Sequence, residues 1–282
     1  MDALDIVLLH GGWHCSASWG PLVPLLLAEG HRVVTPDLPG HGWRARFPVD
    51  YFTEGQPGLQ EQPATLGATT LEIAADETIG TLTSLRASGA GRSSVLVSHS
   101  SSGAVASRVA EKRPDLVDHL AYVAAIVPSR LRSAFEVGAL PEYGSPVMDG
   151  LVVGDPAAVG ALRINPRSTD PQYRDLLHSK FYSDIAPEEA APFLALISPD
   201  QPLSLLAESV SVTPQRWGSI PRTYVATLRD KAIAPAVQEI LINDADAFAP
   251  ANRFQRIPID TGHSPFASRP AELAGILHSL GR

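Results

Sequence analysis

Short apolar runs alternate along most of this chain with longer stretches of helical periodicity, and this alternation most limits what the chain can fold into. Four strand patterns lie before residue 128 and two more follow residue 221. The strands are predicted at 6–9, 32–35, 94–97, 120–127, 223–227 and 254–259, and the helices at 19–29, 70–88, 102–113, 235–243 and 271–280. Strands that alternate with helices form parallel β-α-β units. We therefore predict an α/β fold whose doubly wound, mostly parallel sheet carries helices on both faces.

Proline is distributed unevenly. Twelve of the 25 prolines lie between Pro128 and Pro221, which is one third of the 282 residues. Within this third, 171–184 and 187–198 have helical patterns that begin with proline, a residue tolerated in the first turn of a helix. We interpret 128–221 as a helical cap inserted into one core, formed by 1–127 and 222–282. A second irregular stretch, 44–68, lacks periodicity, and loops of this length are usually functional or disordered.

Composition argues against several kinds of partner. With 22 basic and 30 acidic residues the net charge is −8 and the pI is about 5.6, which disfavours binding to nucleic acid or to an anionic membrane. No window of 18 apolar residues occurs and no basic segment precedes the first apolar run, so we expect a cytoplasmic protein with no membrane association. The single cysteine, Cys15, fits a reducing compartment. A homodimer through the cap or an edge strand is compatible with the sequence but not required by it.

A serine-rich turn follows the strand predicted at 94–97. The segment Ser98-His99-Ser100-Ser101-Ser102-Gly103 leads into a helix, and a serine at such a turn is raised at the carboxyl edge of the sheet when small residues lie two positions before and after it. Both Ser100 and Ser102 meet this condition. We choose Ser100 as the nucleophile because it lies three residues beyond the last strand valine. The alternative is a serine-rich loop in which Ser102 is only a helix N-cap.

A nucleophilic serine needs a base, and the base needs a carboxylate to orient it. His263 follows the strand predicted at 254–259, and Asp230 follows the one at 223–227, so both are expected at the same sheet edge as Ser100. Three other carboxylates compete for the role of the acid, namely Asp244, Asp246 and Asp260. The first two follow a helix rather than a strand, and the third is too close to His263 in the chain to fold back easily.

The loop after the first strand supplies the remaining parts of such a site. Backbone N–H groups must stabilise the developing oxyanion, and we assign them to Gly12 and to Ser101, the residue after the nucleophile. Gly11 and Trp13 flank Gly12 and are predicted to contact substrate. His10 and His14 are spaced like helical zinc ligands, but two glycines between them deny a helix, and we expect no metal and no cofactor.

These motifs together resemble the α/β-hydrolase superfamily, and within it the branch of plant salicylate and methyl-ester esterases, hydroxynitrile lyases and their bacterial relatives. The segments that carry the resemblance are Leu8-Leu9-His10-Gly11-Gly12, Pro36-Asp37-Leu38-Pro39-Gly40-His41-Gly42, the serine turn, Arg229-Asp230-Lys231-Ala232-Ile233 and Gly262-His263. The resemblance implies an α/β-hydrolase fold with Ser100 as nucleophile, Asp230 as acid and His263 as base. It also implies that Gly12 and Ser101 donate to the oxyanion.

Two departures from this branch bear on the reaction. Its hydroxynitrile lyases carry a lysine directly after the catalytic histidine and a threonine after the first-strand histidine, whereas this chain has Ser264 and Gly11. We therefore expect a serine hydrolase that cleaves a carboxylic ester or lactone of a small to medium apolar substrate through an acyl-enzyme. Non-hydrolytic cyclisation, acyl transfer or a lyase reaction in the same pocket is the alternative. A ligand-binding protein on a hydrolase fold is disfavoured because all three triad residue types are retained.

Overall fold

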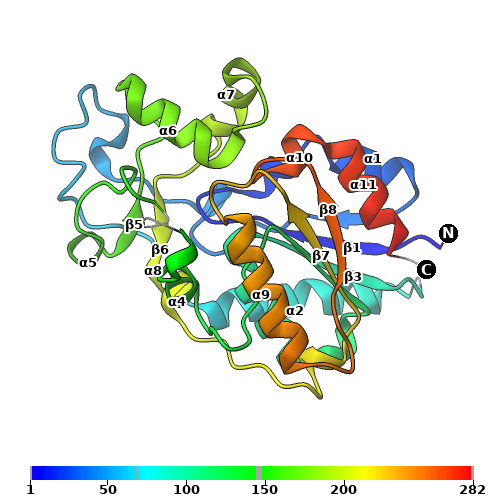
Figure 1. The fold of residues 1–282 in the computed structure, drawn as a ribbon. Helices are drawn as coiled ribbons and strands as arrows, with labels where there is room; N and C mark the ends of the chain where they lie inside the picture. Colours follow the sequence, from blue (N-terminus) through cyan, green and yellow to red (C-terminus); the bar gives the residue numbers. More distant parts are fainter. Residues whose placement is uncertain (1, 68, 90, 144–147, 281–282) are drawn as a thin grey trace.

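The computed structural model describes residues 2–67, 69–89, 91–143 and 148–280, and its centre is a six-stranded sheet (Figure 1). The strand order is β2-β1-β3-β4-β7-β8, and every neighbouring pair is parallel. These strands are β1 Asp5–Leu9, β2 Arg32–Val34, β3 Ser94–His99, β4 His119–Val123, β7 Arg222–Thr227 and β8 Gln255–Ile259. The chain moves from β1 to one edge and then from β3 to the other, which confirms the doubly wound sheet. Its switch point, where ligands bind in such sheets, lies between β1 and β3.

Helices cover both faces of the sheet because the strand side chains alternate between two apolar clusters. Val7 and Leu9 pack on one side, and Ile6 and Leu8 pack on the other. On the first side lie α2 (Leu71–Ala87), α3 (Gly103–Lys112) and α9 (Pro235–Phe248), and on the second lie α1 (Val23–Ala28), α10 (Pro265–Ser268) and α11 (Pro270–Ser279). Burial of each valine, leucine or isoleucine side chain in these clusters stabilises the fold by roughly 1.5–3 kcal/mol. In the described residues no helix is both long enough and apolar enough to cross a membrane.

Some predicted element boundaries are wrong for local reasons. The helix predicted at 19–29 begins only at Val23, because Pro24 has no N–H and is tolerated only in a first turn. The strand predicted at 120–127 ends at Val123, since Ala124 has a φ of 44°. The start of α2 is as predicted, with the Thr70 hydroxyl accepting a hydrogen bond from the N–H of Ile73.

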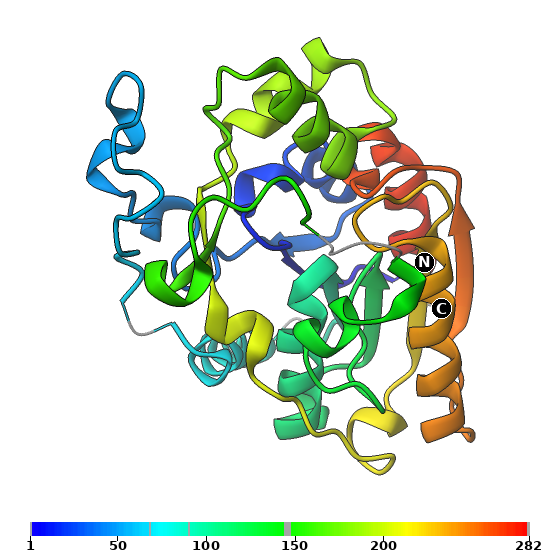
Figure 2. The same ribbon diagram turned by 60° about the vertical axis from the view of Figure 1, so that its left-hand side comes forward.

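Residues 128–221, of which 144–147 lie outside the described residues, connect β4 to β7, two neighbouring strands. In its described part, the α-helices and strands of this inserted segment are α4 Ala134–Gly138, α5 Pro156–Val159, β5 Ala161–Arg163, α6 Pro171–Tyr182, α7 Pro187–Ala195, β6 Asp200–Pro202 and α8 Leu203–Ala207. The helices α6 and α7 lie beyond the carboxyl ends of the sheet, whereas the stretch after α8 returns past the end of α3 to the start of β7 (Figures 1 and 2). The helices α6 and α7 correspond to the two helical patterns of the sequence. The antiparallel pair of β5 and β6 was not predicted, because three-residue strands carry almost no periodic signal. The domain boundaries themselves stay a prediction.

The stretch predicted as an irregular loop at 44–68, of which residue 68 lies outside the described residues, begins at the end of a 3-10 helix, Gly42–Arg44, and contains a second, Val49–Phe52. It is tied to the inserted segment by a buried arginine. Nη1 of Arg163 donates to the carbonyls of Leu59 and Gln62, at 2.6 and 2.7 Å, while the rest of its guanidinium is paired with Asp200. The stretch is therefore anchored to β5, although it protrudes from the molecule (Figure 2).

Candidate active site

The turn between β3 and α3 holds Ser100 in a backbone conformation that L residues rarely adopt. Its φ is 56°, which costs a non-glycine residue of the order of 1–2 kcal/mol. Two glycines make room for this turn. A Cβ on Gly11 would lie 2.9 Å from Cβ of Ser100, and one on Gly103 would lie 1.9 Å from the carbonyl oxygen of Ile126. The close approach thus requires glycine at 11 and 103, and the sequence analysis had not singled out Gly103.

The two candidate serines occupy different environments. Ser102 is buried, and its hydroxyl bonds to the carbonyls of Leu9 and His99, at 3.0 and 2.8 Å, and to the N–H of His99. It therefore ties β1 to the end of β3 and is not in the cavity wall formed by the described residues. Ser100 lines a cavity of about 640 Å³ at the carboxyl ends of the strands. The geometry thus favours Ser100 over Ser102 as a group that can reach a ligand.

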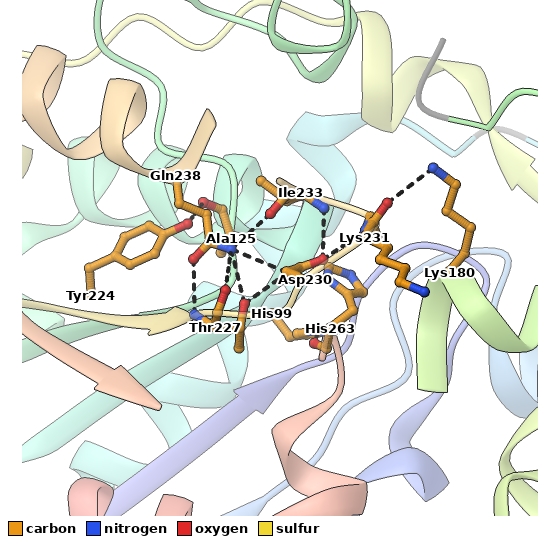
Figure 3. Close-up of polar contacts among 11 residues, drawn as sticks. His99, Ala125, Lys180, Tyr224, Thr227, Asp230, Lys231, Ile233, Gln238 and His263 are labelled. Atoms are coloured by element: carbon orange, nitrogen blue, oxygen red, sulfur yellow. Dashed lines mark hydrogen bonds and ion pairs between the residues drawn. The ribbon is translucent and has the colours of Figure 1, made fainter. Parts of the chain in front are cut away.

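His263 and Asp230 meet at the same sheet edge. Nδ1 of His263 lies 2.8 Å from Oδ2 of Asp230, and because a carboxylate only accepts, Nδ1 carries the proton (Figure 3). Both side chains are almost fully buried, yet His263 lines the same cavity as Ser100. The Nδ1–H tautomer leaves the Nε2 lone pair of His263 free to accept a proton.

Other polar groups fix the Asp230 carboxylate. Oδ1 accepts the backbone N–H groups of Ala232 and Ile233, at 2.7 and 2.9 Å, and Oδ2 accepts the hydroxyl of Thr227 at 2.8 Å. The amide of Gln238, on α9, donates to Oδ2 at 3.3 Å and also bonds to Thr227 and Ile233 (Figure 3). Sequence reasoning missed Thr227 and Gln238, because a lone glutamine in a helix gives no sign of its partner.

The three competing carboxylates have structural partners elsewhere. Asp244 and Asp246 lie within α9, which runs to Phe248 and is longer than predicted. Asp244 pairs with Arg130, Asp246 accepts the N–H of Phe254 and pairs with Arg256, and Asp260 pairs with Arg229, each at 2.8 Å. None of them bonds to His263 in the described part of the chain.

His99 is a further residue of the site that the sequence analysis did not assign. Its Nε2–H donates to the backbone carbonyl of His263 at 2.9 Å, so the residue before the serine also holds the loop that carries the histidine. Burial, and then the nearby His263 and His14, hold the pKa of His99 well below its usual range. A neutral His99 places no competing charge beside His263.

The loop after β1 is braced by two neutral histidines. Nδ1–H of His10 donates to the carbonyl of Gly11 at 2.9 Å, and Nδ1–H of His14 donates to that of Gly12 at 2.8 Å. Burial lowers the pKa of His10 to about 3 and that of His14 to about 4. The N–H of Gly12 makes no hydrogen bond to any described residue, and a Cβ there would lie 3.3 Å from Oγ of Ser101.

Trp13 and Ser101 line the cavity, whereas Gly11 and Gly12 are not among its described lining residues. The wall is mostly apolar, with residues of the inserted segment facing Ser100 and His263. Its apolar members from that segment include Ala134, Phe135, Ala139, Met148, Val152, Leu162, Phe181 and Leu206. Asp149 is the only carboxylate, and no lysine or arginine occurs, among the described lining residues.

The model of the alpha/beta hydrolase family matches residues 6–276. This chain belongs to that family. The hydrolase is 27% identical over 276 residues to the pyrethroid hydrolase of Sphingobium wenxiniae, covering 97% of this chain and 86% of the relative. It is 26% identical over 255 residues to salicylic acid-binding protein 2 of Nicotiana tabacum, covering 86% and 85%. The solved structure of polyneuridine aldehyde esterase superposes with a TM-score of 0.74 at 19% identity and 100% coverage of both chains.

These comparisons confirm two expectations from the sequence. The hydrolase fold is present along nearly the whole chain, and the relatives are named as hydrolases and esterases, including a methylesterase of Arabidopsis thaliana at 26% identity. The hydrolase is therefore an enzyme of the esterase type, and its relatives include methylesterases of the kind that the motifs indicated.

Proposed function

We propose that this hydrolase cleaves a carboxylic ester or lactone of a small to medium apolar substrate through an acyl-enzyme. The observation that carries the proposal is the 2.8 Å hydrogen bond from His263 to Asp230 at a cavity that His263 shares with Ser100. A base oriented by a buried carboxylate, next to a serine on a strained turn, is the arrangement that serine hydrolysis requires. The esterase and hydrolase names of the relatives support the same reaction class.

In the proposed mechanism the hydroxyl of Ser100 attacks the substrate carbonyl and its proton passes to Nε2 of His263. Asp230 keeps the Nδ1 proton of His263 in place and stabilises the imidazolium. The N–H groups of Gly12 and Ser101 donate to the tetrahedral oxyanion, aided by the positive end of α3. Collapse of this intermediate transfers the proton from His263 to the leaving alcohol. Water then attacks the acyl-enzyme by the same steps in reverse order and releases the acid.

The cavity wall supports an uncharged, apolar substrate. A free carboxylate on the substrate would enter a space with no arginine or lysine among the described lining residues, and it would lose hydration without compensation. At about 640 Å³ the cavity is within the range of small-molecule sites. We expect activity to be highest with neutral esters or lactones whose acyl or alcohol part is hydrophobic.

Replacement of Ser100 by alanine tests the proposal. With a p-nitrophenyl ester we expect Ser100→Ala to lower kcat by at least about 10⁴-fold while the protein stays folded. The matched control is Ser102→Ala, which removes a buried hydroxyl that bonds only to backbone groups. That variant should lose about 1–3 kcal/mol of stability but keep its activity within about tenfold. Full activity of Ser100→Ala, or loss of activity in Ser102→Ala alone, would overturn the assignment.

Two further measurements separate hydrolysis from its alternatives. Turnover in water enriched in oxygen-18 should place one labelled oxygen in the acid product, and an unlabelled product would indicate cyclisation or transfer. A fluorophosphonate probe should label the wild-type protein and not Ser100→Ala. A wild-type protein that the probe leaves unlabelled would indicate a ligand-binding protein instead.

A further inference from the structure

The inserted segment holds the backbone of Trp13, the residue after the proposed oxyanion donor Gly12. The N–H of Trp13 donates to Oε1 of Gln201 at 2.9 Å, and its carbonyl accepts from the N–H and the hydroxyl of Ser198, at 2.9 and 3.1 Å. The indole N–H of Trp13 donates to the carbonyl of Leu162 at 2.9 Å. Every polar group of Trp13 thus bonds to residues of 128–221, and none of these partners belongs to the core sheet.

The hydrogen bonds to Gln201, Ser198 and Leu162 act on a residue with a strained backbone. Trp13 has a φ of 61°, in the left-handed region that non-glycine residues avoid, and its neighbours Gly11 and Gly12 have no Cβ to restrict them. Without an external restraint, the loop would be free to move to other backbone conformations. The hydrogen bonds to the inserted segment therefore stabilise a conformation that the loop sequence itself disfavours.

Hydrogen bonds on both sides of Gly12 restrain the direction of its N–H. The peptide that carries this N–H is held at its carbonyl, on Gly11, by His10. The next peptide is held at both ends, at the carbonyl of Gly12 by His14 and at the N–H of Trp13 by Gln201. Because Gly12 lies between two held peptides, its φ and ψ are restrained from both sides. Loss of the Gln201 bond would leave the second peptide held at its carbonyl alone, and this would loosen the restraint on the direction of the Gly12 N–H.

Gln201 is itself held rigidly. Its Oε1, which accepts from the N–H of Trp13, also lies 2.8 Å from Nε2 of His41. The strand that carries Gln201 is paired with β5, where Leu162 lies opposite Gln201 and Arg163 lies opposite Asp200. The Arg163 and Asp200 side chains form a fully buried bidentate ion pair. Trp13 therefore bonds to both Leu162 and Gln201, which lie opposite each other on β5 and β6. The neighbouring ion pair of Arg163 and Asp200 fixes the register of these two strands.

We propose that Gln201 is a positioning residue of the oxyanion hole, through which the inserted segment sets the direction of the Gly12 N–H. The inference rests on the proposed function, since it concerns how an oxyanion would be stabilised. It predicts that Gln201 helps to stabilise the transition state and does not affect the affinity for the substrate. It also gives the inserted segment a role in the reaction itself, in addition to forming the pocket wall.

The test compares Gln201→Leu, which has a similar volume but no acceptor, with Gln201→Glu, which keeps an acceptor oxygen. For a p-nitrophenyl ester we expect Gln201→Leu to lower kcat by about 10- to 100-fold with KM within about threefold of wild type. Gln201→Glu should recover kcat to within about tenfold of wild type.

Inhibitor affinities distinguish positioning from a general loss of structure. A trifluoromethyl ketone with the same apolar group forms a tetrahedral adduct, whereas the corresponding p-nitrophenyl ether resembles the substrate and forms no oxyanion. In Gln201→Leu the affinity for the ketone should fall by the same factor as kcat/KM, and the affinity for the ether should be unchanged. Tyr173→Phe is the matched control, because it removes hydrogen bonds to Leu151 and Asn165 inside the inserted segment without contacting the loop. Its kcat should equal that of wild type.

Three outcomes would overturn the inference while the proposed function stands. They are wild-type kcat in Gln201→Leu, a change confined to KM, and an equal loss of affinity for the ketone and the ether. If Gln201→Leu does not fold, Ser198→Ala replaces it, because it removes only the hydroxyl contact to the Trp13 carbonyl. That variant should lower kcat about two- to fivefold with KM unchanged, and no change would count against the inference. A wild-type protein that neither hydrolyses esters nor binds the ketone would refute the proposed function, and this inference with it.

Discussion

Replacing Asp230 by asparagine should separate the orienting role of the acid from its contribution to folding. The carboxylate accepts five hydrogen bonds in a site that is almost closed to solvent. The donors are the N–H groups of Ala232 and Ile233 on Oδ1, and Thr227, Gln238 and His263 on Oδ2. An asparagine of the same shape has only one acceptor oxygen, so one set of donors must face its NH2 group.

The geometry of the site determines which set of donors loses its acceptor oxygen. The two backbone N–H groups cannot turn away, so the asparagine oxygen should stay with Ala232 and Ile233, and the NH2 group should face His263. His263 then lowers the energy by moving its proton from Nδ1 to Nε2 and accepting at Nδ1. This tautomer cannot take the proton of Ser100, so we expect kcat to fall about 10⁴-fold. The hydroxyl of Thr227 can turn to accept from the new NH2 group, so only the amide of Gln238 is left as a facing donor, at a cost of about 1–3 kcal/mol of stability.

The measurement is kcat and KM on a p-nitrophenyl ester, together with the free energy of unfolding from urea titration. Asp260→Asn is the matched control, because Asp260 also lies near His263 in sequence but forms an exposed ion pair with Arg229. That control should keep its kcat and lose no more than about 1 kcal/mol of stability. A folded Asp230→Asn with kcat within tenfold of wild type would refute the role of Asp230. Equal losses of activity in both variants would do the same.

Two predictions concern the stability of the fold. Gly103→Ala should destabilise the protein by about 3 kcal/mol or more, because its Cβ would lie 1.9 Å from the Ile126 carbonyl oxygen. Gly80→Ala, in α2 with no atom within 4 Å of the new Cβ, should instead stabilise it by about 0.5–1 kcal/mol; urea titration checks both. Lower pH should also destabilise the fold. His10 and His14 are buried with pKa values of about 3 and about 4, whereas the unfolded chain takes up these protons near pH 6.5. Between pH 7 and pH 5 each should therefore cost about 2 kcal/mol, and an unfolding free energy that does not fall over this range would contradict the burial of neutral histidines.

Features of the fold that depend only on residues close together in the sequence could be predicted. The sheet follows from apolar runs of strand length, and the ends of those runs place Ser100, Asp230 and His263 at one edge, because parallel strands share their carboxyl ends. The Thr70 cap and the two proline-led helices of the inserted segment depend on one or two neighbouring residues. Boundaries failed where one residue overrode the pattern, as Pro24 did at the start of α1 and Ala124 at the end of β4.

Features that depend on distant partners were not predictable. The requirement for glycine at 103 comes from Ile126, and the fixed orientation of Asp230 depends on Gln238 in the following helix. Gln201 lies 188 residues from Trp13, and nothing in the segment around it distinguishes an acceptor for a backbone N–H from an ordinary polar residue. Such contacts follow from the packing of the inserted segment on the core, which no local pattern in the sequence records.

The core and the inserted segment contribute different parts of the site, so substitutions in the two should have different effects on kcat and KM. Ser100, Asp230 and His263 follow the ends of core strands, whereas the inserted segment forms much of the apolar wall and also restrains Trp13. If the inserted segment only shaped the pocket, substitutions there would alter KM and substrate preference and leave kcat intact. Because it also holds the loop beside the proposed oxyanion hole, changes that shift β5 and β6 should lower kcat for every substrate. Substitutions of wall residues remote from Gln201, such as Phe135 or Val152, should change preference alone.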